Sequence, residues 1–370
     1  MSKLVIKRIA YAVVIVAVLT LIWANRTGRL EPRSYKGEGE LIPVSDTTDW
    51  PEKTIPVTVG AWVEDISDFD VSAQTFKSSG SVWFIWPADF QALLDLKKIP
   101  VDAFFTVANA LDGYSVTPIY ETPQRLSDGR FYQAFQYTGT FLAFGLDFRR
   151  FPFQAVQLPL AFSINAEKFS SASPFIRLIP DEQQSGIGEY VHIPGYVTNG
   201  KKMTEWIYHF GTRFGLPPEF SGTEMTGSRV QMTLIYQRSV ITSVLKLIFP
   251  LVVVMTVVLL SPSLAASLWD VRIALPSTAL LTLVFLQQSY ADQLPPLPYL
   301  TFIDQIYALS YATALAFFAL FVWSSNQLET AGENRQFVVQ KINRVDLRFQ
   351  IIFAVGIVVL ATLGWFVPVR

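Results

Sequence analysis

The segment DVRIALPSTALLTLVFLQQSYAD, residues 270–292, is the most informative part of the chain because it combines a helix-length apolar run with one stripe of different chemistry. Seven of its residues recur at steps of three or four, the spacing of one helical face: Asp270, Ala274, Thr278, Leu281, Phe285, Gln288 and Asp292. The stripe runs from an acid through small and hydroxyl side chains to bulky apolar ones, then to an amide and an acid. This order predicts a pore lining, with carboxylates that attract cations at both mouths and an apolar constriction that closes by dewetting.

A single stripe cannot enclose water, so the pattern predicts a homo-oligomer in which several copies surround an axis. Simpler interpretations stay open. Asp270 is also a good residue to cap a helix start, and Leu281 and Phe285 also suit ordinary packing between helices. Arg272 is expected to point away from the axis, toward a neighbouring helix or the cytoplasm. Pro276 removes a backbone hydrogen bond, so it either widens the inner mouth or marks a later start of the helix.

The composition indicates a membrane protein. Of the 370 residues, 51% are hydrophobic and only 16% are charged, and the mean hydropathy is +0.34. The net charge of -1 gives no reason to expect a nucleic-acid partner. The absence of cysteine excludes disulfides, thiolate metal sites and cysteine nucleophiles. No catalytic or phosphate-binding motif is present, and His192 and His209 are too few for a metal site. We therefore expect neither an enzyme nor a cofactor.

The chain divides into four parts by composition. Residues 1–25 carry a basic flank, with Lys3, Lys7 and Arg8, before a short apolar run, which predicts a signal peptide or a signal anchor. Residues 26–49 are expected to be a linker. Residues 50–238 alternate with a period of two between turn residues, which predicts a mainly antiparallel, immunoglobulin-like β-sandwich. Residues 239–370 are predicted to form a transmembrane domain.

The expected strands follow the alternation closely. Val57, Val59, Ala61 and Val63 are predicted to point one way and Thr58, Trp62 and Glu64 the other. Further strands are expected at 81–86, 115–120, 131–141, 157–164, 206–213 and 230–238, with a short helix at 88–98. The last part predicts a four-helix transmembrane bundle with spans at 240–260, 271–291, 303–324 and 348–368.

Loop charge predicts the orientation of the spans. The stretch 325–347 is expected to be a loop, and it is basic, as is residue 348 that follows it: Arg335, Lys341, Arg344 and Arg348. Because basic loops stay in the cytoplasm, the sandwich is expected on the outer side of the membrane. The basic amino-terminal flank gives the same answer independently.

The order of these parts resembles the pentameric ligand-gated ion channels, the Cys-loop receptor superfamily, and specifically its bacterial branch. The resemblance spans roughly residues 50–368. It is carried by several motifs: the run LDFRRFPF at 146–153, which is similar to the family's signature loop; Ser228, Arg229 and Val230 with Arg238 before the first span; Pro250 in that span; Thr278 to Thr282 in the second; and Leu294, Pro295, Tyr299, Leu300, Asp304, Ile306 and Tyr307 after it.

The resemblance implies a homopentamer in a bacterial inner membrane, permeable to monovalent cations and gated at the outer domain by a small molecule or by protons. It also implies that motion of the sandwich passes to the pore helix through a set of coupling residues. These are Asp147, Arg149, Phe151, Pro152, Phe153, Arg238, Pro295 and Tyr299.

The chain departs from the family pattern in places. Phe144 and Leu158 stand where the family has its two cysteines. Bacterial members of the family commonly lack that disulfide. Gln154 replaces the acid that would partner Arg238, and Asp68, Asp70 or Asp147 are the alternatives for that role. Asn165 replaces the first aromatic of an amine cage, and the loop from 214 to 227 lacks paired cysteines, which argues against an acetylcholine-like ligand.

The aromatic residues of the sandwich supply candidates for a ligand cleft, although most sandwich aromatics belong to a core. The candidates are Trp83, Trp86, Tyr114, Phe175, Tyr196, Phe214 and Phe220.

Taken together, the sequence patterns and the resemblance lead to the hypothesis of a ligand-gated or proton-gated cation channel. One rival is a membrane receptor or scaffold with the same fold that does not conduct. A second rival is a transporter or membrane enzyme, for which we would expect broken paired helices or clustered ionisable groups at mid-membrane.

Overall fold

The chain forms two compact units. The computed structural model describes residues 39–366, apart from residues 46, 47, 49, 51, 112, 166–168, 170–174, 190 and 211–224, and it also describes residues 20, 23, 24 and 27. One unit, here called the sandwich unit, comprises Tyr35–Leu146 and Ala155–Arg238. The other, here called the helical unit, comprises Met1–Ser34, Asp147–Gln154 and Ser239–Arg370. Most of the predicted signal segment and most of the predicted linker lie outside the described residues.

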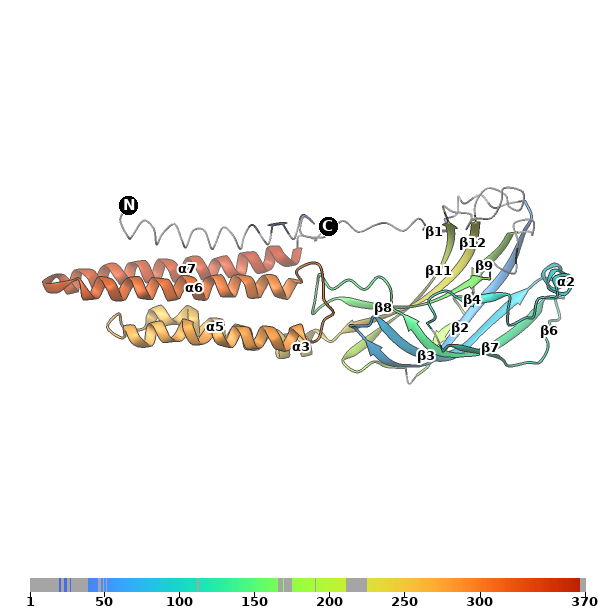
Figure 1. Ribbon diagram of the computed structural model, residues 1–370, viewed down its shortest axis with the longest axis horizontal. Coiled ribbons are helices and arrows are strands. Elements are labelled where there is room, and N and C mark those ends of the chain that lie inside the picture. Colours follow the sequence, from blue (N-terminus) through green and yellow to red (C-terminus); the bar gives the residue numbers. More distant parts are fainter. Residues whose placement is uncertain are drawn as a thin grey trace. The chain divides into compact units, whose positions relative to one another are not determined.

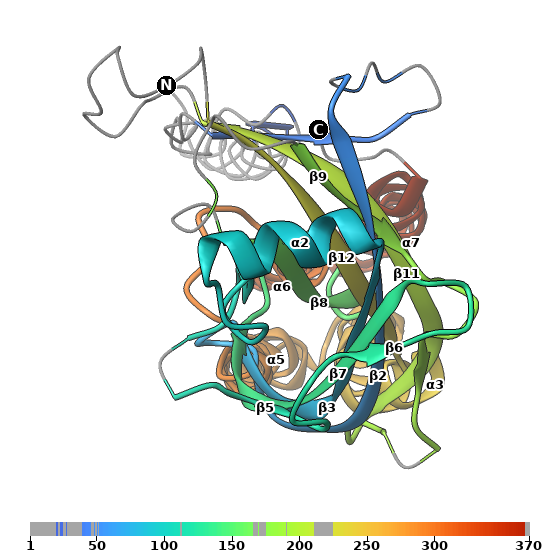
Figure 2. The ribbon, with the colours of Figure 1, turned by 90° about the vertical axis from the view of Figure 1, so that its right-hand side faces the viewer.

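Two sheets build the sandwich unit over its described residues. The first has the order β1 (Gly39–Pro43), β11 (Tyr196–Phe210), β12 (Met225–Arg238), β8 (Ala155–Ile164) and β4 (Phe105–Val107). The second has the order β10 (Gly186–Ile187), β2 (Thr54–Asp70), β3 (Thr75–Trp86), β7 (Phe131–Leu142) and β5 (Ser115–Pro118), while β6 (Gln124–Arg125) pairs with β7 and β9 (Phe175–Pro180) pairs with β2. Only β9 and β10 pair in parallel among these strands, so the predicted mainly antiparallel arrangement is confirmed. Figure 2 views this unit from the end that carries α2 (Ala88–Lys97).

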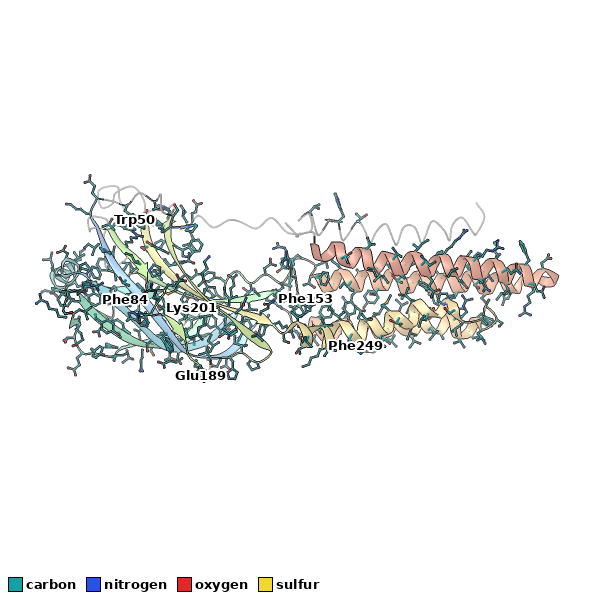
Figure 3. The ribbon with its side chains drawn as sticks, turned by 180° about the vertical axis from the view of Figure 1, so that it is seen from behind. Trp50, Phe84, Phe153, Glu189, Lys201 and Phe249 are labelled. Atoms are coloured by element: carbon teal, nitrogen blue, oxygen red, sulfur yellow. The ribbon has the colours of Figure 1, made fainter. Side chains whose placement is uncertain are left out.

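The core of the sandwich follows from the alternation in the sequence. Val57, Val59, Ala61 and Val63 of β2 are fully buried, whereas Trp62 is exposed, as the period of two predicts. Aromatic rings fill the space between the sheets. Phe84 of β3 lies there, with ring centroids 4.4 Å from Phe105, 4.9 Å from Phe104 and 6.1 Å from Phe135 (Figure 3).

One predicted strand is much longer in the structure. The pattern places a strand at 206–213, but β11 begins at Tyr196 and pairs with β12 along its length. A bulge between Thr198 and Lys201 interrupts the register. Because this part of β11 is polar and irregular, it shows no alternation that the sequence could reveal. The short helix predicted at 88–98 is confirmed as α2, which ends at Lys97 and is followed by Lys98 in the left-handed conformation.

Over its described residues the helical unit contains four long helical segments, which run alongside one another (Figure 1). The first spans Val240–Ser263 and contains α3 (Val240–Ser243), a π-helical turn (Val244–Ile248) and α4 (Phe249–Leu260). The others are α5 (Trp269–Ala291), α6 (Phe302–Glu329) and α7 (Arg335–Phe366). Pro250 lacks an N–H for the helical ladder, and the π-helical turn directly before it accommodates that missing bond.

Three of these segments are long and apolar enough to cross a membrane: Val240–Ser263, Trp269–Ala291 and Phe302–Glu329. Their length and composition indicate a membrane protein. A shared apolar cluster holds the unit together, with Val258 of α4, Ala279 of α5 and Phe317 of α6 buried in it. Phe349 and Phe353 of α7 pack against the same cluster.

The stretch 325–347, expected to be a loop, is mostly helical. Helix α6 continues to Glu329 and α7 starts at Arg335, so only residues 330–334 connect them. The reason lies in α7, where Ile342 and Asp346 are buried on one face while Arg344 and Arg348 are exposed on another. The charges that suggested a loop therefore belong to the polar face of an amphipathic helix.

Candidate functional site

The stripe predicted from the sequence lies on one exposed face of α5. Each of its members is exposed in the isolated chain: Asp270, Ala274, Thr278, Leu281, Phe285, Gln288 and Asp292. The buried residues of α5 are Arg272, Pro276, Ala279, Leu283 and Tyr290, and this other face packs toward α4 and α6. The most exposed large apolar side chain of the stripe is Phe285, at 67%. This face is therefore free to meet water, lipid or another copy of the chain.

The observed start of α5 shows whether Asp270 caps this helix and whether the helix begins only at Pro276. The N-cap residue is Leu268, so Asp270 does not cap the helix but lies in its first turn, where the helix dipole favours an acid. The suggestion that Pro276 marks a later start is wrong, because the helix begins at Trp269 and continues through Pro276. At the other end, Gln288 Nε2 donates to Asp292 Oδ1 at 3.0 Å.

Arg272 points to a neighbouring helix, as predicted. It is buried, and its guanidinium donates to the carboxylate of Asp346 on α7. No local pattern predicted Asp346 as its partner, because 74 residues separate the two.

The second part of the candidate site is the loop Asp147–Gln154, which packs within the helical unit. Two hydrogen bonds tie it to the start of α6. The amide of Phe148 donates to Tyr299 Oη at 3.1 Å, and the amide of Phe302 donates to the carbonyl of Arg149 at 2.8 Å. The guanidinium of Arg149 also lies 4.8 Å from the centroid of the Tyr299 ring. The structure thus brings together Arg149, Phe151, Phe153 and Tyr299 from the predicted coupling set.

Aromatic packing extends this contact onto α5 and α6. Phe151 stacks on Tyr290 of α5 with ring centroids 6.3 Å apart, and Phe153 lies 6.4 Å from Phe302 (Figure 3 labels Phe153). Tyr290 also lies 5.1 Å from Tyr307 of α6. The loop therefore contacts both helices at one place.

A capping interaction that the sequence analysis missed anchors the start of α6. Thr301 Oγ1 accepts a hydrogen bond from the Asp304 amide, and the Thr301 amide donates to Asp304 Oδ2 at 2.8 Å. The same carboxylate accepts a hydrogen bond from the Tyr290 hydroxyl, so it joins α5 to α6. The spacing of Thr301 and Asp304 was the available signal, because a hydroxyl residue followed three positions later by an acid indicates a capping box.

Of the other members of the predicted coupling set, Asp147 and Pro152 belong to the same loop, and Pro295 follows α5 in the helical unit. Arg238 belongs to the sandwich unit, at the end of β12 opposite Tyr196. Burial raises the pKa of Tyr196, and the charge of Arg238 opposes that shift. Each of the three acids considered as partners for Arg238 also makes a contact with another residue. Asp68 pairs with Lys77 at 2.6 Å, Asp147 with Arg149 at 3.4 Å, and Asp70 accepts from the amide of Ser72 at 2.7 Å.

The described aromatic ligand candidates have different neighbours in the sandwich unit. Trp83 Nε1 donates to Asp181 at 3.3 Å, and Tyr114 lies directly over Gly139. Phe175 packs near Trp50, with ring centroids 5.7 Å apart, and Tyr196 packs edge-on against Phe69. Trp86 is fully buried in the core. Phe214 and Phe220 lie outside the described residues.

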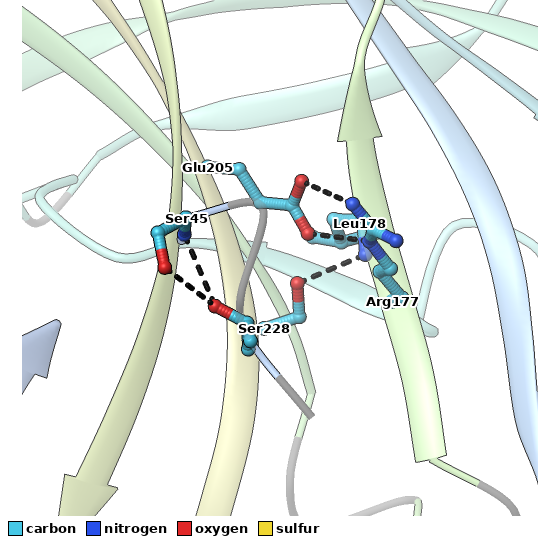
Figure 4. A network of polar contacts seen from close by, with 6 residues as sticks. Ser45, Arg177, Leu178, Glu205 and Ser228 are labelled. Carbon is cyan, nitrogen blue, oxygen red and sulfur yellow. Dashed lines mark hydrogen bonds and ion pairs between the residues drawn. The ribbon is translucent and has the colours of Figure 1, made fainter. Parts of the chain in front are cut away.

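A polar network that sequence reasoning missed lies near the candidate Phe175, on the same strand β9. Arg177 of β9 makes two hydrogen bonds to the carboxylate of Glu205, at 2.7 and 3.0 Å (Figure 4). The Arg177 guanidinium also lies 4.2 Å from the centroid of the Trp50 ring. The neighbouring Leu178 amide donates to Ser228 Oγ at 2.9 Å. Because the two charges of this network pair with each other, we interpret it as a structural interaction that holds β9, β11 and β12 together.

Neither a scan against protein-family models nor a search of curated proteins finds a match for this chain. The fold defines a membrane protein with a β-sandwich-like region and at least three helices long enough to span a bilayer. The resemblance to pentameric channels stays a prediction.

Proposed function

We propose that the chain is one subunit of a cation-permeable channel, built from five copies and gated by a small molecule or by protons acting on the sandwich. In this proposal α5 lines the pore, and α7 joins the three candidate spans as the fourth helix of a transmembrane bundle. The observation that carries the proposal is that six members of the predicted stripe lie exposed on α5 and the seventh, Asp292, is exposed at its C-cap, while another face of α5 is buried.

The comparison of α4 with α5 supports a water-facing surface. The exposed side chains of α4 are apolar except for Thr256, whose hydroxyl donates to its own helix at the Val252 carbonyl, 2.7 Å away. Such a surface suits lipid. The exposed face of α5 instead carries two acids, an amide and Thr278 among its apolar residues. Polar groups at membrane depth face a bundle interior or water rather than lipid, which favours a pore.

The loop Asp147–Gln154 supplies the route for coupling in this proposal. It is continuous in sequence with β7 and β8 of the sandwich on its two sides, yet it packs on α5 and α6. A change in the sandwich that moves the loop would be transmitted to α5 through Phe151 and Tyr290. Ligand binding shifts the closed and open populations only as far as the ligand prefers one of them.

The charges of α7 support the orientation in this proposal. Arg335, Lys341, Arg344 and Arg348 are exposed and precede the apolar part of the helix. By the positive-inside rule, this end lies in the cytoplasm and the sandwich faces outward. The protein would then reside in the plasma membrane of a bacterium.

Planar-bilayer recording from purified protein tests the proposal. We expect discrete cation-selective currents, and we expect Asp270→Lys to move the reversal potential in a salt gradient toward the anion value. Asp128→Lys, at an exposed acid of the sandwich, is the matched control and should leave selectivity unchanged. A purified oligomer that conducts under no tested ligand or pH would favour the non-conducting receptor. Unchanged selectivity in Asp270→Lys would remove that residue from the pore.

A further inference from the structure

A buried pair of opposite charges connects α5 to α7. Arg272 is 1% exposed and Asp346 is 2% exposed, and their side chains share a hydrogen bond and an ion pair. The Arg272 guanidinium also lies 4.4 Å from the centroid of the Phe321 ring on α6. We call Arg272, Asp346 and Phe321 the charge node. Three helices therefore meet at one buried cation.

Stability alone does not account for such a pair. Removing two charges from water is costly, and replacing a buried ion pair with well-packed apolar residues is often neutral or stabilising. The cost is larger in a unit whose surroundings are apolar. A well-supported role of a buried polar pair is to favour one arrangement of elements over others, because every other arrangement leaves a charge unpaired.

The arrangement that this pair favours concerns the first turn of α5. Asp270 and Arg272 are two residues apart, so they point about 200° apart around the helix axis. Burying Arg272 at the charge node therefore directs Asp270 to the opposite side, and Asp270 is indeed exposed. Rotation of this turn by one residue would separate Arg272 from Asp346.

The same pair fixes the orientation of α7. Asp346 shares a buried or half-buried face with Ile342, Phe349 and Phe353. Arg344 and Arg348 lie on the exposed side of the same helix. Because Asp346 is committed to Arg272, the acid is withdrawn from this basic surface. The position of α7 and the rotation of α5 are thus set together.

We propose that Arg272 and Asp346 are positioning residues that set the rotation of the first turn of α5 and hold the Asp270 carboxylate on the exposed face. The importance of that face for ion selection rests on the proposed function. The positioning itself does not, and it can be measured without recording any current.

Cysteine labelling provides that measurement, because the natural chain contains no cysteine. Asp270→Cys reports on the turn beside the charge node. Leu281→Cys, also exposed but farther along α5, serves as the internal reference. The protein is reconstituted in vesicles and labelled with a small water-soluble thiol reagent, and the ratio of the two labelling rates is the readout. A purely structural role for the charge node would not change this ratio in a folded variant.

The main test combines Arg272→Met with Asp346→Leu, which removes both charges and leaves none unpaired. We expect the ratio of labelling at position 270 to that at 281 to change by at least about fivefold, the lower end of ordinary coupling between sites. The control is Asp128→Leu with Arg130→Met, which removes an exposed ion pair of the sandwich and should leave the ratio unchanged.

A second variant guards against a failure to fold. Arg272→Lys keeps the charge for Asp346 but loses the planar group that stacks on Phe321, and a smaller change of the ratio in the same direction is expected. An unchanged ratio in either variant, once folded, overturns the proposal. If the native protein conducts no ions while the ratio still changes, the proposed function fails and the positioning role stands.

Discussion

The two units of this protein distribute polar and apolar side chains in opposite ways. In the sandwich unit, β2 buries its valines and exposes Glu64. In the helical unit, Phe249, Val253 and Leu260 of α4 are exposed, whereas Arg272 and Asp346 are buried. A fold gains from burying apolar surface only when water surrounds it. The sandwich is therefore organised for water, and the helical unit for surroundings that are themselves apolar.

The contrast also distinguishes the faces of one helix. Exposed acids are costly on a surface that meets only lipid. Nevertheless, Asp270 in the first turn of α5 and Asp292 at its C-cap are both exposed. The exposed face of α5 therefore resembles neither the water-facing surface of the sandwich nor the apolar exposed surface of α4. This exception supports an aqueous path shared by several copies.

The largest effect is expected when the same substitution is made in both units. Phe84→Ala in the sandwich core should lower the free energy of unfolding by about 3–5 kcal/mol, because the cavity it leaves is lined by other rings. Phe285→Ala on the exposed face of α5 should change stability by no more than about 0.5 kcal/mol. Unfolding of the purified variants in detergent checks both. A large loss for Phe285→Ala in the isolated subunit would contradict the exposed placement.

A smaller difference is expected for buried polar side chains. Asn109 of the sandwich donates to the carbonyls of Pro159 and Leu142 at 2.7 and 3.0 Å and accepts from the Ala161 amide at 3.0 Å. Asn109→Ala should cost about 3 kcal/mol, because it leaves buried backbone groups without partners. Ser324 of α6 has a buried hydroxyl without a hydrogen-bond partner in the described part of the chain. Ser324→Ala should therefore be neutral or stabilising, and a loss comparable to that of Asn109→Ala would refute this assignment.

Periodicity explains which parts of this structure were predictable. The alternation from Val57 to Val63 predicts a buried face of a strand, and the spacing from Asp270 to Asp292 predicts one face of a helix. The structure buries Val57, Val59, Ala61 and Val63 and leaves the stripe residues exposed. The two β2 partners β9 and β10 were missed because strands of such length show too few alternations. The helical start of α7 was missed because a basic amphipathic turn resembles a charged loop in sequence.

Long-range partners were beyond the sequence for a different reason. Nothing local relates Arg272 to Asp346 or Arg177 to Glu205, since each pair forms only after distant elements pack. The loop at 146–153 was identified through its resemblance to a family. Its contact with Tyr290 was not predicted, because that depends on the packing of α5 against α6.

A local effect of about tenfold is expected at the loop. Tyr299→Phe removes the hydroxyl that accepts from the Phe148 amide but keeps the ring beside Arg149. Loss of one hydrogen bond of about 1.4 kcal/mol should speed hydrogen exchange of the Phe148 amide roughly tenfold. Hydrogen exchange followed by mass spectrometry measures this change. Tyr114→Phe, at an exposed tyrosine of the sandwich, is the control, and equal exchange in the two variants would count against the contact.

The smallest effect concerns a buried tyrosine hydroxyl in the sandwich core, and it is confined to high pH. Tyr137 is buried, with its hydroxyl 3.4 Å from that of Ser78, and burial raises its pKa above the ordinary value of 10.0. Unfolded chains therefore lose this proton first as the pH rises. The neutral hydroxyl contributes its full stability below about pH 10, and this contribution declines above it by up to about 1.4 kcal/mol per pH unit.

Tyr137→Phe removes the titrating group, so its stability should fall less steeply above pH 10 than that of the natural chain. Other tyrosines and the lysines titrate equally in both proteins, which makes the difference between the two curves specific to Tyr137. Denaturant unfolding between pH 8 and pH 11 provides the curves. Parallel curves would mean that the hydroxyl reaches water in the folded protein, and the core of the sandwich would then admit polar groups as readily as the helical unit does.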